Sequence, residues 1–211
     1  MKHILLIATG GTIASRPTEN GLAPQLLADD ILRCVPALGS LCRIDAVQPM
    51  NIDSTNMSPD CWLALADCLR AHYDQYDGFV IAHGTDTMAY TACALSYLVQ
   101  QSGKPIVLTG AQKSIYVQDT DARRNLYDAF VAAQDDNLAG VYIVCDGRVI
   151  LCTRARKTRT KSMNAFSSID YPDVALIRDG RILHYIRQPR PQTPPAFYGR
   201  QEACMLTSSR R

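Results

Sequence analysis

The sequence lacks a long hydrophobic run near its start, because only Ile4 to Ala8 are continuously apolar before the polar segment at Thr9. Such a run is too short for the core of a signal peptide or for a membrane-spanning helix. The 8 cysteines include no CxxC pair and are accompanied by no histidine cluster, which argues against a metal site and suits a reducing compartment. We therefore expect a cytoplasmic protein that does not contact a membrane and that needs neither a metal ion nor another cofactor.

Two nucleotide-binding signatures are also missing, the Gly-Lys-Thr of a Walker motif and GxGxxG. The net charge of +2 is unevenly spread: residues 1–146 hold 9 basic and 16 acidic residues, and residues 147–211 hold 13 basic and 4 acidic residues. A basic C-terminal third could bind nucleic acid. Its arginines are scattered, however, and no aromatic-interleaved binding motif accompanies them. We expect no nucleic-acid partner, because an acidic surface of another subunit in an oligomer would explain the basic residues equally well.

Apolar runs alternate with helical patterns over the first two thirds of the chain, which predicts a largely parallel sheet with helices on both faces. The predicted strands lie at 4–8, 43–47, 78–82 and 105–108, and the predicted helices at 25–35, from 59 after a Ser58 cap, at 87–101 and at 121–134. Residues 9–24 and 111–119 are predicted to be loops; a loop as long as the first usually serves a function, such as that of an active-site lid.

The pattern changes after residue 140. Asp146-Gly147 joins two apolar runs, 141–144 and 149–152, and Asp179-Gly180 joins 175–177 to 182–184; both are hairpin signatures. The fold class we predict is therefore α/β: a mostly parallel open sheet, with antiparallel hairpins at its C-terminal end. A basic, hydroxyl-rich segment at 154–161 lies between the two hairpins.

Two short motifs follow predicted strands, Thr9-Gly10-Gly11-Thr12-Ile13-Ala14 and His83-Gly84-Thr85-Asp86-Thr87-Met88. Ligands bind where parallel strands end in sheets of this kind. A threonine hydroxyl needs a base to become nucleophilic. Asp86 lies beside Thr85, and Lys157 of the basic segment could complete a Thr–Lys–Asp unit that follows the logic of the serine triad. The motif glycines could also present backbone N–H groups to an oxyanion.

Each of these features has a plainer interpretation when it is taken alone. Thr-Gly-Gly-Thr could be a tight turn, or a phosphate loop at a helix N-terminus. Asp86 could cap the helix that follows it. A single lysine such as Lys157 is more often a solvated charge. The residues alone therefore predict two hydroxyl-bearing strand ends that face a ligand, and they do not name the ligand.

Taken together, these segments resemble the bacterial-type L-asparaginase family, threonine amidohydrolases that convert asparagine into aspartate and ammonia. The resemblance covers residues 3–187 in unbroken order. The matching segments are 8–14, 77–81 with 83–91, Asp53-Ser54-Thr55-Asn56-Met57, Lys104-Pro105-Ile106-Val107-Leu108-Thr109-Gly110-Ala111-Gln112 and Arg156-Lys157-Thr158-Arg159-Thr160.

The resemblance implies a role for each matching position. Thr12 would be the nucleophile that forms an acyl-enzyme with the side-chain amide. Thr85, Asp86 and Lys157 would form a second group that activates a hydroxyl or water. The substrate would be L-asparagine, with L-glutamine as a minor substrate, and the family implies a homo-oligomer. The residues that would contact the substrate are Ser54, Thr55, Thr85, Asp86 and, through its backbone carbonyl, Ala111.

Two departures from the family pattern stand out. Some members carry a tyrosine in the mobile loop that assists the nucleophile, where this chain has Leu22; Lys157 or Tyr116 would have to take that role. Full members also have a smaller second domain. The residues that follow the Pro-rich stretch of this chain do not resemble the start of that domain. We therefore expect a catalytic domain at 1–187, and a linker with an atypical tail at 188–211.

Three hypotheses follow for function. The first is an L-asparaginase. The second is a truncated, weakly active or inactive fragment that binds amino acids or pairs with a full-length partner. The third is the asparaginase-like subunit of a tRNA-dependent amidotransferase, which the basic C-terminal third would suit.

Overall fold

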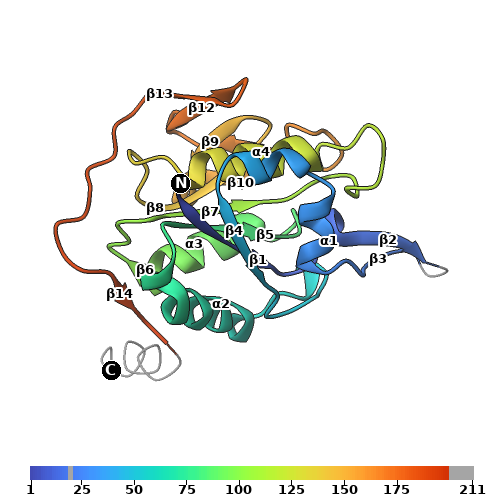
Figure 1. Ribbon diagram of the computed structural model, residues 1–211, viewed down its shortest axis with the longest axis horizontal. Coiled ribbons are helices and arrows are strands. Elements are labelled where there is room, and N and C mark those ends of the chain that lie inside the picture. Colours follow the sequence, from blue (N-terminus) through green and yellow to red (C-terminus); the bar gives the residue numbers. More distant parts are fainter. Residues whose placement is uncertain (19–20, 200–211) are drawn as a thin grey trace.

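A mixed eight-stranded sheet forms the centre of the computed structural model, which describes residues 1–18 and 21–199 but not the side chains of residues 16–24 (Figure 1). In spatial order the strands are β13 (Arg181–His184), β12 (Ala175–Arg178), β9 (Arg148–Leu151), β8 (Gly140–Cys145), β7 (Pro105–Thr109), β5 (Gly78–Ala82), β1 (His3–Ala8) and β4 (Arg43–Val47). From β8 to β4 all pairings are parallel, whereas β8, β9, β12 and β13 pair antiparallel. The predicted fold class is confirmed.

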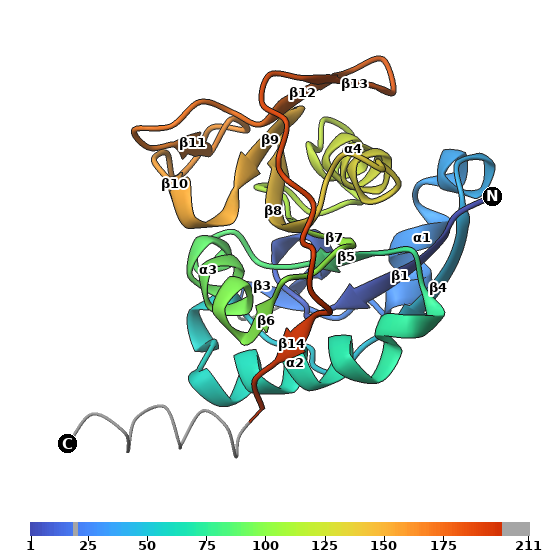
Figure 2. The same ribbon diagram turned by 90° about the vertical axis from the view of Figure 1, so that its left-hand side faces the viewer.

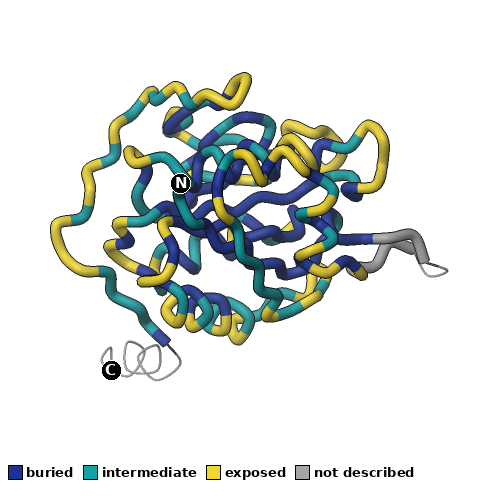
Figure 3. Tube along the Cα trace, viewed as in Figure 1, coloured by how far each residue is buried: buried dark blue, intermediate teal, exposed yellow. Residues whose placement is uncertain are grey.

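Helices cover both faces of this sheet (Figure 2). α1 (Ala28–Arg33) and α4 (Ala122–Ala133) pack on one face, and α2 (Pro59–His72) and α3 (Met88–Leu98) on the other. Successive strand residues point to opposite faces, so Leu6 and Val80 face α1 and α4, whereas Leu5 and Phe79 face α2 and α3. The central strands are buried on both sides, as the dark core of Figure 3 shows.

Short elements complete the fold. They are η1 (Thr12–Ala14), β2 (Ser15–Thr18), β3 (Gly21–Pro24), η2 (Pro36–Ser40), η3 (Ser54–Asn56), η4 (Tyr73–Gln75), β6 (Val99–Gln100), η5 (Cys152–Arg154), β10 (Ala155–Lys157), β11 (Phe166–Ser168) and β14 (Ala196–Phe197). The strands β10 and β11 pair antiparallel, so the basic segment begins as one arm of a small hairpin.

Both predicted hairpin turns are confirmed by their backbone geometry. Asp146 and Gly147 have φ of 51° and 72°, and Asp179 and Gly180 have φ of 51° and 69°. Two successive residues with positive φ match the right-handed twist of the strands that they join, and Asp-Gly adopts this conformation at little steric cost.

The prediction of one long loop at 9–24 is wrong. After η1 the chain forms the β2–β3 hairpin, in which Ser15 pairs with Pro24 and Thr18 with Gly21 (Figure 1). The predicted helix at 25–35 is also too long, because α1 has only 6 residues. Gln25 and Leu26 donate their backbone N–H groups to the Ala14 oxygen, so the hairpin holds the start of the predicted helix in another conformation.

Two further helix ends differ from prediction. Ser58 precedes α2, but its side chain makes no capping hydrogen bond to the backbone and instead lies 3.4 Å from the Cys61 sulfur. The helix predicted at 87–101 ends at Leu98, because the chain then extends into β6. This helix is buried on one side only, since Tyr90 and Tyr97 are exposed.

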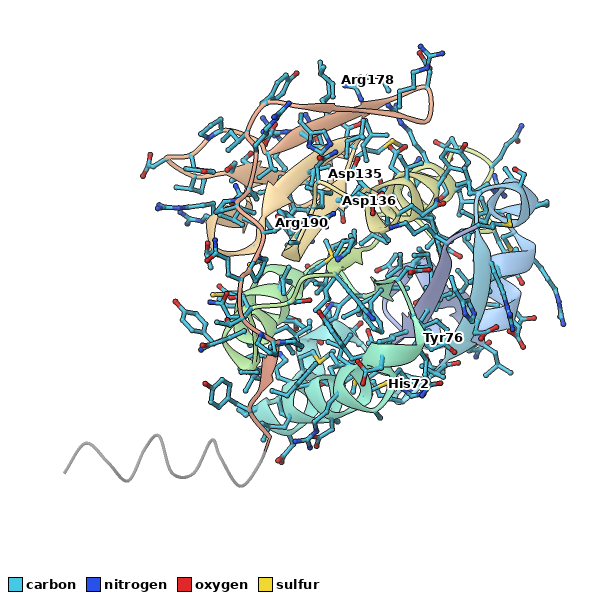
Figure 4. All side chains as sticks on the ribbon, turned by 60° about the vertical axis from the view of Figure 1, so that its left-hand side comes forward. His72, Tyr76, Asp135, Asp136, Arg178 and Arg190 are labelled. Carbon is cyan, nitrogen blue, oxygen red and sulfur yellow. The ribbon has the colours of Figure 1, made fainter. Side chains whose placement is uncertain are left out.

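The Pro-rich stretch predicted to be a linker runs back along the domain as far as Gly199, and residues 200–211 lie outside the described part of the chain. Its Arg190 donates to the backbone oxygen of Asp136 (Figure 4). Further along, β14 pairs with β6, and the Phe197 ring packs edge-on against Tyr73 at 5.2 Å. The described part of this stretch is therefore held against the domain by contacts at both ends.

No helix in residues 1–18 or 21–199 is long and apolar enough to cross a membrane. Of the cysteines that the structure describes, Cys42, Cys145 and Cys152 are buried, and the other four are partly exposed; all seven are free thiols.

Candidate active site at the carboxyl end of the sheet

The parallel strands have an order that brings both threonine motifs to one place. From β1 the chain first adds β4 on one side and then β5, β7 and β8 on the other, so the direction of winding reverses between β1 and β5. Ligands bind outside the carboxyl ends of the strands at such a reversal. Thr12 follows β1, and Thr85 and Asp86 follow β5, so both motifs lie at this point of the sheet.

The two motif loops touch through their glycines. A Cβ on Gly11, whose φ is 74°, would lie 2.4 Å from the Gly84 Cα atom, and a Cβ on Gly84 would lie 2.5 Å from the Ser54 hydroxyl. The Gly11 N–H donates to the Ile52 oxygen at 3.0 Å. This hydrogen bond shows that the Gly11 N–H supports the loop and is not free to stabilise an oxyanion, contrary to one interpretation of the sequence.

The predicted Thr–Lys–Asp unit is assembled by the fold. The Lys157 Nζ atom, at the end of β10, donates to the Thr85 hydroxyl at 2.8 Å and to Asp86 Oδ1 at 2.7 Å. The Lys157 side chain is only 14% exposed, whereas that of Asp86 is 58% exposed. Lys157 is therefore a largely buried cation whose two partners are both site residues, and it is not a freely solvated charge.

Thr12 lies at the start of η1 and is partly buried. Among the described residues, no hydrogen bond joins its side chain to Lys157, which instead contacts Thr85 and Asp86. Tyr116, the other candidate to assist it, is 48% exposed in the loop that follows β7. The side chain of Leu22, at the position where some family members carry a tyrosine, is outside the described part of the chain, although its backbone pairs with Pro17.

The predicted substrate-binding residues lie near this point in two further segments, η3 and the loop after β7. Ser54 is buried at the start of η3, and its backbone oxygen accepts a hydrogen bond from the Thr87 hydroxyl at 2.7 Å. Thr55 is exposed, and both its N–H and its hydroxyl donate to Asp53. Ala111 is buried directly after Gly110, where a Cβ would lie 2.3 Å from the His83 oxygen.

A cavity of about 720 Å³ adjoins Asp86 and Lys157 and extends between α3 and β10. Its further walls include Tyr90, Arg154 and Arg159. The cavity opens Asp86 and Lys157 to solvent and to small molecules, whereas Thr12, Thr85 and Ser54 are not among its lining residues. No group of three His, Cys, Asp or Glu side chains within residues 1–18 and 21–199 is arranged to hold a metal ion.

Sequence reasoning missed one polar side chain at this site. In the sequence Gln112 is only the end of a matching segment, yet its Oε1 atom accepts a hydrogen bond from the Thr85 hydroxyl at 3.3 Å. The signal that could have found it is its position, because it lies in the loop directly after β7, the strand adjacent to β5.

His83 is buried beneath the site. Its Nδ1 atom donates to the Gly84 oxygen at 2.7 Å, and its Nε2 atom has no partner among the described residues. Burial lowers the pKa of His83 to about 4, although the bond to Gly84 opposes this shift. A histidine with a lowered pKa stabilises the fold fully above its unfolded pKa near 6.5, and this stabilisation is lost as the pH falls toward 4.

We therefore expect acid to destabilise the wild-type chain more than the His83→Gln variant. Between pH 7.5 and pH 4.5 the wild type should lose about 2 kcal/mol more than the variant in the free energy of unfolding, measured by urea titration. Burial raises the pKa of Asp128 to about 6, which lowers stability as the pH rises from about 4 to about 6. Both proteins carry Asp128, so its contribution cancels in the comparison. Equal acid sensitivity of the two proteins would contradict the prediction.

The chain is similar to several known proteins. The family model described as "Asparaginase, N-terminal" matches residues 3–190. The L-asparaginase of Thermococcus kodakarensis is 39% identical over 185 residues, covering 85% of this chain and 55% of that protein. A glutamyl-tRNA(Gln) amidotransferase subunit from Methanococcus vannielii is 36% identical over 203 residues, covering 91% of this chain and 47% of that protein.

Solved structures give the same result. The thermostable L-asparaginase from Thermococcus kodakarensis superimposes with a TM-score of 0.86 at 37% identity, covering 92% of this chain and 60% of that structure. The probable cytoplasmic L-asparaginase from Campylobacter jejuni gives a TM-score of 0.82 at 32% identity, covering 92% of this chain and 61% of that structure. The chain thus spans about half to three fifths of the length of these relatives. From its fold, its motif geometry and these matches, we conclude that the chain belongs to the asparaginase family.

Proposed function

We propose that this chain is the catalytic part of an L-asparaginase, which hydrolyses the side-chain amide of L-asparagine to aspartate and ammonia. The observation that supports this most directly is the Lys157 ammonium, which donates to Thr85 and Asp86 across 72 and 71 residues of sequence. A lysine held between a hydroxyl and a carboxylate can exchange a proton with that hydroxyl, as a triad base does. Relatives named as L-asparaginases support the same reaction.

In the proposed mechanism Thr12 is the nucleophile. Its hydroxyl oxygen attacks the amide carbon of the substrate, and its hydroxyl proton passes to the amide nitrogen. The C–N bond then breaks, ammonia leaves, and an acyl-threonine ester remains. The Thr85–Lys157–Asp86 unit then activates the water that hydrolyses this ester. The contact between Gly11 and Gly84 supports such a division of labour, because it holds the two loops against each other.

The proposed substrate is a small amino acid with free α-amino and α-carboxylate groups. Asp86 uses Oδ1 for Lys157, and Oδ2 has no donor among the described residues, so this exposed oxygen can accept the α-amino group. The Ser54 hydroxyl would bind the α-carboxylate, Thr55 would join it by exchanging its hydrogen bond to Asp53 for one to the substrate, and the Ala111 carbonyl would face the amide. Asparagine and glutamine differ by one methylene, and an apolar contact to one methylene discriminates by roughly 10- to 200-fold. We therefore propose glutamine as a minor substrate.

We further propose that the protein works in the cytoplasm as a homo-oligomer, without a cofactor. The Campylobacter jejuni relative named as probably cytoplasmic supports the location. The basic composition of residues 147–211 would suit an acidic surface on another copy. We also propose that residues 1–187 form the catalytic domain, and that residues 188–211 are a linker with an atypical tail.

Ammonia release from L-asparagine and L-glutamine by the purified chain tests this function. Turnover of asparagine, with slower turnover of glutamine, is the expected result. Calorimetry with L-aspartate distinguishes an active asparaginase from the alternative. Binding of aspartate without any turnover would favour a fragment that binds amino acids or pairs with a full-length partner.

A second candidate, a subunit of a tRNA-dependent amidotransferase, is favoured by the match to the Methanococcus vannielii protein and by the basic segment at 154–161. Nucleic-acid binding of this kind is electrostatic and strongest at low salt. A lack of tRNA binding at low salt would eliminate this candidate.

A further inference from the structure

The side chain of Gln112 lies between Thr85 and the loop at 158–165 that joins β10 to β11. Its Oε1 atom accepts a hydrogen bond from the Thr85 hydroxyl at 3.3 Å, and its Nε2 atom donates to the Ser162 backbone oxygen at 3.2 Å. The backbone N–H of Gln112 donates to both carboxylate oxygens of Asp121, at 2.9 and 3.1 Å. Gln112 is thus anchored at its backbone and makes a polar contact with each end of its side-chain amide.

These contacts determine the direction of the Thr85 hydroxyl. A backbone carbonyl only accepts hydrogen bonds, so the amide nitrogen of Gln112 must face Ser162 and the amide oxygen must face Thr85. The single proton of Thr85 therefore points to Gln112. The lone pairs of the Thr85 oxygen are left to accept from the Lys157 ammonium at 2.8 Å.

We propose that Gln112 is a positioning residue for the Thr85–Lys157 pair of the amidohydrolase proposed above. While Lys157 is charged, Gln112 holds the Thr85 proton away from it and so stabilises the charged pair. Once Lys157 is neutral, its lone pair attracts that proton, and the bond to Gln112 gives way because it is longer than an ordinary hydrogen bond between oxygens. Thr85 can then take a proton from the attacking water while its own proton passes to Lys157.

The same side chain fastens the loop that follows Lys157. Ser162 is held by Gln112, and the Cys145 thiol donates to the Met163 oxygen at 3.5 Å. At the near end of this loop, the Thr158 N–H donates to the Ala165 oxygen at 2.8 Å. Because Thr158 directly follows Lys157, the contact between Gln112 and Ser162 helps to keep the Lys157 ammonium at Thr85.

Two substitutions of Gln112 separate its polar role from its bulk. Gln112→Met keeps the length of the side chain but removes both hydrogen bonds. Gln112→Glu keeps an acceptor for Thr85, repels the Ser162 carbonyl and adds a negative charge near Lys157, whose charged partner in the structure is Asp86. Asp121, the carboxylate behind Gln112, is present in both variants. Gln75→Met is the matched control, since among the described residues the Gln75 amide donates only to Ala71, on an exposed helical turn.

We expect kcat for asparagine to fall about tenfold in both Gln112 variants, with KM within about threefold of the wild type. The limb of the pH–rate profile that reports the base should move to lower pH in Gln112→Met, because the charged pair has lost an acceptor. It should move to higher pH in Gln112→Glu, because the added carboxylate favours the ammonium. Gln75→Met should match the wild type in each of these measurements.

A measurement that does not depend on turnover keeps this inference separate from the proposed function. The 13Cε NMR shift of Lys157, followed against pH, should show its titration midpoint moving down in Gln112→Met and up in Gln112→Glu. Midpoints that stay at the wild-type value, or that move in the same direction in both folded variants, would overturn the role of Gln112. Absence of ammonia release by the wild type would overturn the proposed function instead, and thermal unfolding identifies a variant that has lost its fold.

Discussion

Thr12→Ala is expected to lower kcat for asparagine hydrolysis at least about a thousandfold, equivalent to about 4 kcal/mol of the activation barrier. Alanine has no hydroxyl oxygen with which to form the acyl bond. The change should leave the fold intact, because the Thr12 side chain makes no hydrogen bond to another described residue and is partly exposed. Ammonia release at saturating asparagine measures the effect.

Thr12→Ser is the matched comparison for this variant. Serine keeps the hydroxyl and loses only a methyl group, so it should recover a measurable part of the wild-type rate. Wild-type turnover by Thr12→Ala would show that the acyl bond forms on another residue or that the reaction passes through no acyl bond. Thr85 would then be the first alternative to test, since it is the other motif threonine at this edge of the sheet.

Lys157→Met is expected to lower kcat by about a thousandfold, within the range observed when a general base is removed. Methionine fills a similar space but can neither exchange a proton with Thr85 nor pair with Asp86. The unfolding temperature should change little, because Asp86 is 58% exposed and an ion pair with such a partner contributes little to stability. The result would thus separate a role in the reaction from a role in folding.

The combination of Lys157→Met with Thr85→Ala sharpens this test. Residues that act as one unit show strongly non-additive losses, so the double variant should be little slower than either single variant. Lys161→Met is the control, because Lys161 is an exposed lysine of the loop that follows Lys157 and has no part in the proposed site. Losses that simply multiply in the double variant would show that Thr85 and Lys157 do not act as one unit.

Several features of the fold could be predicted from local sequence because their causes are local. The apolar runs at 4–8 and 78–82 are strands since such residues suit a sheet buried on both faces, and both threonine motifs follow those strands directly. Asp146-Gly147 forms its turn because two successive residues there must adopt positive φ. The helix predicted from Pro59 agrees with α2, which begins at that residue.

Other features could not be predicted because they depend on contacts between distant segments. The helix predicted at 25–35 is short because Gln25 and Leu26 bond to Ala14, a partner that exists only once the β2–β3 hairpin has formed. From the sequence alone, the glycines of both motifs are interpreted as positions where backbone N–H groups face a ligand. In the structure Gly11 and Gly84 are required by the close approach of two loops, which no single motif reveals.

The sequence by itself determined the strands, the α/β class and the presence of two threonines where adjacent strands end. Only the tertiary structure decided which charged and polar side chains contact these threonines. Lys157 joins Thr85 and Asp86 from a hairpin more than 70 residues away, and Gln112 joins Thr85 from the loop after the next strand of the sheet. Strand formation depends on near neighbours in the chain, whereas these contacts depend on strand order and register, which are set by packing across the whole sheet.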